Sequence, residues 1–225
     1  MKKFFAAISL FFALSLTHAQ EVYDSGLKKE SRLGIGIKAA FDYGYIYGFE
    51  EEDDDVDGNP SGIGFDAGIM FRLQLVKNFD FTPELSFAYV KTAHDYLEAE
   101  RSYTRMDLEI PLLLRGTVAN RFFVTFGPQF NIKLDDETKI KNDDGELVEK
   151  IEQSSLDFGM AAGLGVKIVG NFFFDIRCYM GLKELFPDVS YIGDADVDMS
   201  GNWSMIDMAG AKMFKFKAGF SYWFI

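Results

Sequence analysis

The sequence predicts an all-β fold, an eight-stranded antiparallel up-and-down transmembrane β-barrel, and three observations lead to this prediction. Apolar and polar residues alternate with a period of two in eight segments between Leu33 and Phe224. The connections between the segments are alternately short and long. Aromatic residues make up 16% of the 225 residues and recur at the ends of the segments. Such alternation is typical of strands with one apolar face, and the segments are long enough for a tilted crossing of a bilayer.

The chain begins with the pattern of a cleaved signal peptide. Two basic residues, Lys2 and Lys3, precede an apolar run over residues 4–16, and small residues follow at Thr17 and Ala19. The run is too short to cross a membrane as a helix. The pattern therefore predicts export, with this division of the chain: residues 1–19 as a signal peptide that is removed, residues 20–32 as a short periplasmic lead and residues 33–225 as the barrel domain.

The eight predicted strands follow one another along the rest of the chain. They cover residues 33–47, 63–75, 79–89, 106–115, 122–134, 156–168, 172–183 and 212–224. Short polar turns at 76–78, 119–121 and 169–171 alternate with longer loops at 48–61, 92–105, 135–153 and 184–211. In outer-membrane barrels the short turns face the periplasm and the long loops face outward. The pattern therefore predicts a barrel in the outer membrane of a Gram-negative-type bacterium, with both ends on the periplasmic side.

Glycines indicate which face of the strands points inward. A soluble lipocalin-like barrel would have an apolar interior and a polar exterior. In this sequence the polar face carries many glycines, among them Gly64, Gly68 and Gly163. Glycine weakens an exposed strand, whereas a narrow barrel interior needs small residues between large ones. We therefore expect the polar face to line the lumen and the apolar face to contact lipid.

Charged residues of both signs also lie on this polar face, in nearly equal numbers. Because charges confined in a narrow interior must be compensated, we predict that they form a paired network that fills the lumen. Arg115 is expected to compensate Asp107 or Glu109. The predicted lumen network comprises Lys38, Asp42, Asp66, Arg72, Asp80, Glu84, Asp107, Glu109, Arg115, Lys133, Asp157, Lys167, Asp175, Arg177, Lys183, Lys215 and Lys217.

Four short motifs lie on the predicted strands, at residues 83–87, 108–114, 126–129 and 175–177, and the most specific is Leu-Glu-Ile-Pro-Leu-Leu-Leu at residues 108–114. Together they resemble the PorT-type outer-membrane β-barrel family of Bacteroidetes-like bacteria, over roughly residues 33–225. The resemblance implies a fold similar to the small OmpA and OmpX barrels. It also suggests a link to secretion, in which the founding member takes part. The tail at residues 216–225 resembles the terminal strand signal that the outer-membrane assembly machinery reads, except that Ile225 follows the aromatic residue.

Two acidic runs are the candidates for metal binding. Asp53, Asp55 and Asp57 fit the opening of a calcium loop, but the twelfth position is Gly64 where that loop needs a bidentate Glu. The same spacing recurs in the last long loop, again without the Glu, at Asp194, Asp196 and Asp198. We therefore expect no resident cofactor, and at most loosely bound divalent cations near lipopolysaccharide.

The remaining signals argue against catalysis and against nucleic-acid binding. His94 is followed by Asp95, with Ser86 and Ser102 nearby in sequence, but adjacency along a strand does not orient a catalytic triad. The net charge of −12 disfavours contact with phosphate backbones. The single cysteine, Cys178, excludes an intrachain disulfide and lies on the apolar face.

The sequence thus predicts a monomeric, non-enzymatic barrel with a filled polar lumen and acidic outer loops. Its expected role is structural, or that of a surface-interaction or secretion-accessory protein. Its expected partners are outer-membrane lipid, lipopolysaccharide, the assembly machinery and a secretion-system or surface protein. A small-solute pore is the alternative, and a soluble lipocalin-like binder is a weaker one. An eight-stranded barrel is about wide enough for side chains to fill, so the paired charges favour a closed lumen.

Overall fold

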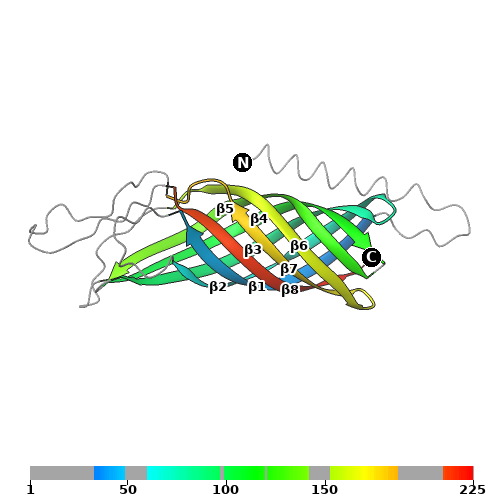
Figure 1. The fold of residues 1–225 in the computed structure, drawn as a ribbon, viewed down its shortest axis with the longest axis horizontal. Helices are drawn as coiled ribbons and strands as arrows, with labels where there is room; N and C mark the ends of the chain where they lie inside the picture. Colours follow the sequence, from blue (N-terminus) through cyan, green and yellow to red (C-terminus); the bar gives the residue numbers. More distant parts are fainter. Residues whose placement is uncertain are drawn as a thin grey trace, which may run out of the picture.

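Eight strands form a closed antiparallel barrel in the computed structural model (Figure 1). The structure describes residues 33–48, 60–96, 99–119, 121–141, 153–186 and 210–224. Each strand pairs with its neighbours in sequence, and the last strand pairs with the first, which closes the sheet. The strands are β1 (Leu33–Tyr47), β2 (Ser61–Val76), β3 (Phe79–Tyr96), β4 (Ala99–Val118), β5 (Phe122–Lys141), β6 (Leu156–Val169), β7 (Phe172–Gly181) and β8 (Lys212–Trp223). The predicted fold class is confirmed.

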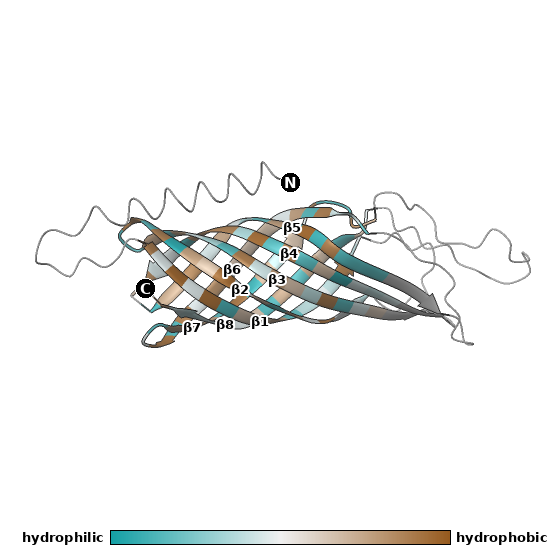
Figure 2. Cartoon of the chain, turned by 180° about the vertical axis from the view of Figure 1, so that it is seen from behind, coloured by the Kyte–Doolittle hydropathy of each residue, from teal (hydrophilic) through white to brown (hydrophobic). Residues whose placement is uncertain are grey.

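The two faces of the barrel differ as the alternation predicts. Phe41 on the outer face is 78% exposed, whereas its neighbour Asp42 is 2% exposed in the interior. Phe65 and Asp66 repeat the contrast in β2, at 50% and 1%. Figure 2 shows hydrophobic and hydrophilic residues alternating along the strands. Apolar side chains are therefore exposed on the outer wall, and charged side chains are buried within it.

The short turns lie at one end of the barrel, which we call the short-turn end; the opposite end is called the outer end. The C-terminus lies at the short-turn end (Figure 1). Asn78 and Gly170 take positive φ angles of 64° and 52° in two of the turns. Asparagine and glycine tolerate this left-handed conformation better than other residues, which explains why the β2–β3 and β6–β7 connections are so tight.

Three strands are longer at the outer end than the sequence predicts. The expected loop at 92–105 is wrong, because β3 continues to Tyr96 and β4 begins at Ala99. Likewise β5 runs to Lys141, into the expected loop at 135–153. Hydropathy alternation stops where the outer face becomes polar, as at the exposed Lys91, although the backbone pairing continues. The extended parts of β3, β4 and β5 form a three-stranded projection (Figure 1), which we call the outer platform.

Inward-facing glycines leave room for large side chains of the adjacent strand. The ring of Phe123 in β5 lies over Gly165 in β6, where an added Cβ atom would overlap it. The β1–β8 contact similarly depends on Gly219, because a Cβ atom there would lie 2.5 Å from that of Ala40. Small residues therefore make room for large ones inside the narrow barrel.

Some predictions lie outside the described residues. These are the signal peptide at 1–19, the lead at 20–32 and most of the acidic outer loops. Within the described part of the chain there is no helix long and apolar enough to cross a membrane.

Candidate functional site

Lys217 lies at the centre of an ionic network inside the barrel. Its Nζ atom is 2.6 Å from Glu109 Oε2, 2.9 Å from Asp66 Oδ2 and 3.2 Å from Asp42 Oδ2. All four side chains are at most 3% exposed. Because Lys217 comes from β8 and Glu109 from β4, this ion pair crosses the lumen and joins opposite walls of the barrel.

A second lysine extends the network towards the outer end. Lys215 Nζ lies 2.9 Å from Glu109 Oε1 and 3.2 Å from Asp107 Oδ2. Arg105 completes this part, with its Nε atom 2.7 Å from Asp107 Oδ1. The two carboxylates thus contact three cations from β4 and β8, counting Lys217.

The network also extends towards the short-turn end. Lys38 Nζ lies 3.3 Å from Asp66 Oδ1 and 3.0 Å from Glu84 Oε2. Arg177 holds the same Glu84 through both terminal nitrogens, at 2.8 and 3.1 Å, and lies 3.4 Å from Asp175. Two-point guanidinium–carboxylate pairs are among the stronger charge-assisted hydrogen bonds. Six of the eight strands, all except β5 and β6, therefore contribute to one connected network of buried charges.

Side chains joined by hydrogen bonds complete the filling beside β5 and β6. The Tyr179 hydroxyl donates to Asp157 at 2.7 Å, and Asn131 donates to the same Oδ2 atom at 3.2 Å. Gln129 in turn donates to Asn131 at 2.8 Å. Leu113 lies in a fully buried cluster with Tyr179. Side chains from the whole wall therefore occupy this level of the lumen.

A short segment after β7 lies at the outer end of the barrel, between the segments that precede β6 and β8. Leu185 and Phe186 are each 1% exposed. The Leu185 backbone donates to Ala211 O and accepts from Ser154 N, both at 2.7 Å. The ring of Phe186 packs against that of Tyr103, with 5.6 Å between the centroids. We call the two apolar residues Leu185 and Phe186 the outer cap.

Polar contacts attach the segment before β6 to the outer platform. Asp136 accepts a 2.7 Å hydrogen bond from Gln153 N and lies 2.8 Å from Lys133 Nζ. Arg105 donates to Ser154 O at 3.0 Å. Burial acts to raise the pKa of Asp136, but the hydrogen bonds from Lys133 and Gln153 outweigh it, so this pKa lies below its ordinary value. The carboxylate that holds these contacts is therefore charged at neutral pH.

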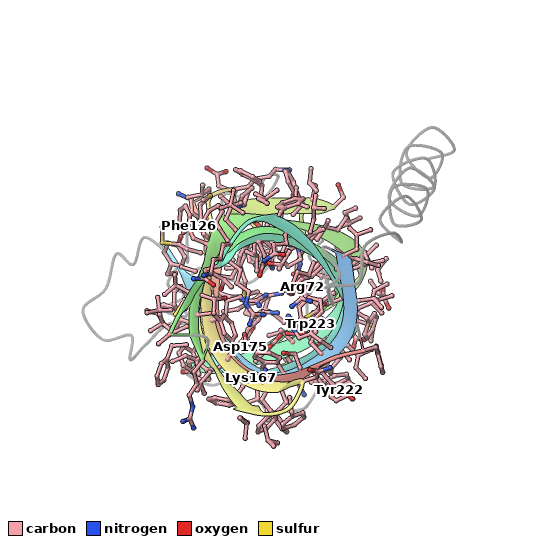
Figure 3. The ribbon with its side chains drawn as sticks, turned by 90° about the vertical axis from the view of Figure 1, so that its right-hand side faces the viewer. Arg72, Phe126, Lys167, Asp175, Tyr222 and Trp223 are labelled. Atoms are coloured by element: carbon pink, nitrogen blue, oxygen red, sulfur yellow. The ribbon has the colours of Figure 1, made fainter. Side chains whose placement is uncertain are left out.

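The short-turn end differs, because its cations lie over aromatic rings. The guanidinium carbon of Arg115 lies 3.7 Å from the centre of the Phe123 ring and 4.9 Å from that of Phe173. Arg72 lies 5.4 Å from the Trp223 ring centre. Figure 3 looks into this end and shows Arg72 and Trp223 inside the ring of strands. A cavity of about 10 Å³ lies here, large enough for about one water molecule.

The structure brings most of the predicted network residues together and places the others elsewhere. Lys183 lies beyond the end of β7 and is exposed, so its lumenal placement is wrong. Arg115 packs against aromatic rings, and the cations that pair with Asp107 and Glu109 are instead Arg105, Lys215 and Lys217. Asp157 accepts hydrogen bonds from Tyr179 and Asn131, and Lys133 lies near the outer platform. Near the short-turn end lie Arg72, Asp80 and Lys167.

Arg105 is the network residue that the sequence prediction missed. It has the same parity as Asp107 and Glu109, but the predicted strand began one residue later, at 106. Extending the parity into the polar segment would have identified it. Trp223 already lies within the predicted strand 212–224 and shares the inward parity of Lys217, so parity alone predicts its burial, and it is 3% exposed.

Most of the residues considered for metal binding or catalysis lie outside the part of the chain whose side chains the structure describes. The acidic residues proposed as metal ligands lie outside the described residues: Asp53, Asp55, Asp57, Asp194, Asp196 and Asp198. In the part that is described, no group of three or more His, Cys, Asp or Glu side chains could hold a metal ion. Ser86 is buried in the interior. Cys178 is exposed, as expected for the outer face.

Comparison with solved structures finds several chains that are similar to this one. Neisserial surface protein A is similar in structure, with 9% identity over 84% of this chain and 96% of its own, at a TM-score of 0.48. Ail of Yersinia pestis, in complex with a heparin analogue, has 13% identity over 85% and 99%, at 0.46. OprG of Pseudomonas aeruginosa has 11% identity over 85% and 96%, at 0.39.

The sequence itself gives the family. Among curated proteins, none matches this chain. The profile described as "Outer membrane protein beta-barrel domain" matches residues 18–187, which is more than half of the chain. The protein therefore belongs to the outer membrane protein β-barrel domain family.

Proposed function

We propose that this protein is a non-enzymatic outer-membrane barrel with a closed lumen, which holds a structured platform at the cell surface. Its role on this proposal is structural, surface-interacting or secretion-accessory. The observation that carries the proposal is the cross-lumen ionic network centred on Lys217. A network that joins opposite walls fixes the shape of the barrel and leaves little room for solute.

Two further features support a closed lumen over a small-solute pore. The outer cap places two apolar side chains, Leu185 and Phe186, at the outer end, where both are almost fully buried. At the other end, the cavity beside Arg115 and Trp223 holds about one water molecule. A pore would need a continuous polar path, and both features act against one.

The outer platform supports a role at the surface. Its strands extend beyond the apolar band, with Lys91 and Glu137 exposed. Backbone pairing continues through the extension, so β3, β4 and β5 form a rigid support for their loops. A projection that does not help to cross the bilayer is best explained by contact with another molecule.

We also propose that the protein belongs to a narrower family. The motifs at residues 83–87, 108–114, 126–129 and 175–177 support placement in the PorT-type family. We further propose export through a signal peptide at 1–19, insertion by the assembly machinery, and a monomer surrounded by lipid and lipopolysaccharide. On this proposal the acidic loops bind divalent cations loosely. Crosslinking on cells, followed by purification in detergent, would identify a secretion or surface partner.

We expect the purified protein to show no steady single-channel openings in planar bilayers. The ionic network and the outer cap should block ion flow through the folded barrel. Folded protein would be verified beforehand by its heat-modifiable migration on gels, since a closed barrel has no free edge from which to unravel. Steady openings of uniform conductance from such protein would refute the closed lumen and support the pore.

The outer platform is expected to face the cell exterior. In a Cys178→Ala background, Ala93→Cys lies exposed on the platform and Lys77→Cys lies exposed in a short turn. A membrane-impermeant maleimide on intact cells should label residue 93 and spare residue 77. After lysis both should react, which controls for intrinsic reactivity. The opposite pattern on intact cells would invert the topology.

A further inference from the structure

Three buried N–H donors at the short-turn end have no acceptor. They are Arg115 Nε, Arg177 Nε and Trp223 Nε1. The three residues are 7%, 4% and 3% exposed, respectively. Buried donors without partners are rare, because each loses its hydrogen bonds to water without replacement. All three residues line the same small cavity, together with the hydroxyl-bearing Thr82 and Ser221. Two carboxylates, Glu84 and Asp175, also line it, and both already pair with Arg177. The unpaired donors therefore surround one shared space.

The cations nearby are held by aromatic rings and not by carboxylates. Arg115 lies over Phe123, and Arg72 lies over Trp223. Lys167 Nζ lies 5.9 Å from the Phe173 ring centre. Among the described residues, none of these three cations has a carboxylate within 4.0 Å. A ring face attracts the charge but accepts no hydrogen bond in the guanidinium plane, so the N–H groups stay available to a ligand.

Positive charge is also in excess at this end. Glu84 is already compensated by Lys38 and Arg177. Asp80 and Asp175 then remain beside the three ring-held cations, Arg72, Arg115 and Lys167. In a narrow interior this imbalance attracts a negative ion, even though the whole chain has a net charge of −12.

We propose that the cavity binds one small monovalent anion of halide size, which enters from the short-turn end. The cavity volume of about 10 Å³ admits a single atom of the size of water or a halide. The unpaired N–H groups supply the hydrogen bonds, and the excess cations supply the charge. The ionic network around Lys215 and Lys217 lies between the cavity and the outer end, so the site is reached from the periplasm in the proposed topology. The assignment goes beyond the proposed function, which stands with or without it.

Bromide is the direct probe, because its anomalous scattering distinguishes it from water. Crystals of the detergent-folded protein grown or soaked in sodium bromide should show one anomalous peak within the cavity, beside Arg115 and Trp223. Thermal unfolding provides a second measurement: a ligand that binds only the folded state raises the midpoint in a saturable manner. We expect chloride and bromide to raise it relative to gluconate at the same ionic strength, because gluconate is too large for the cavity.

A matched pair of variants in β8 tests the residues. Trp223→Phe removes the inward N–H group, and Tyr222→Phe removes a hydroxyl from the outer face next to it (Figure 3). We expect Trp223→Phe to weaken apparent halide affinity by about tenfold, the effect of one lost charge-assisted hydrogen bond, and Tyr222→Phe to leave it unchanged. An ordered water without bromide in the wild-type cavity would overturn the proposal. Equal midpoints in all salts, or equal effects of both variants, would also overturn it.

Discussion

Replacing Lys217 by methionine is expected to lower the free energy of unfolding by about 3–5 kcal/mol. The Lys217 ammonium group compensates Asp42, Asp66 and Glu109 inside a low-dielectric interior. Without it, Asp42 has no other cation within 4.0 Å among the described residues. Leaving a buried charge uncompensated costs far more than removing both members of a pair. Urea unfolding of the barrel in detergent, followed by tryptophan fluorescence, would measure the change.

Lys212→Met provides the matched control, because it makes the same substitution in the same strand. Lys212 lies five residues earlier, at the outer end of β8, where it is only partly buried. We expect a change below about 1 kcal/mol there, as for other surface charges. Adding Asp42→Asn to Lys217→Met should recover part of the loss, because Asp42 is the carboxylate that Lys217→Met leaves uncompensated. Equal losses at positions 212 and 217 would show that the network does not stabilise the barrel.

The inward parity of the network residues was predictable, but their pairing was not. Alternation places Lys217 and Glu109 on the same face, since the side-chain period of a strand is two. The ion pair joins residues 108 positions apart in the chain, on strands that do not neighbour each other in the sheet. Such contacts depend on the tilt and stagger of the strands around the barrel, which no local pattern encodes. The same reason explains why Arg115 was assigned the wrong neighbours.

The outer platform was missed for a different reason. Within the bilayer, lipid requires an apolar outer face, so alternation of hydropathy reveals the strand. Beyond the bilayer both faces can be polar, and the pattern disappears although the pairing persists. Alternate residues of these extended strands still point inward and are buried: Thr92 is 1% exposed and Tyr103 is 4% exposed. Arg105 is absent from the predicted network for the same reason, because the predicted strand begins at residue 106 whereas β4 begins at Ala99.

Leu112→Arg is expected to destabilise the folded barrel in lipid by about 2–4 kcal/mol and to reduce its insertion. Leu112 lies near the middle of the lipid-crossing part of β4, on the outer face that it shares with the 42%-exposed Leu114. An arginine there must leave water and face hydrocarbon near the bilayer midplane. The fraction of heat-modifiable protein after refolding into lipid vesicles measures the effect.

Labelling separates this explanation from a general loss of packing, because Leu112 and Leu113 point to opposite faces. Leu113 is 0% exposed in the lumen, so an arginine at either position would be harmful. In the Cys178→Ala background, a lipid-soluble thiol-reactive probe should instead label Leu112→Cys and spare Leu113→Cys. Removal of Cys178 is necessary because the native thiol is itself exposed on the outer wall. Equal labelling of both cysteines in the folded protein would contradict the assignment of the lipid and lumen faces. Contact with lipid would then not explain the loss of stability in Leu112→Arg.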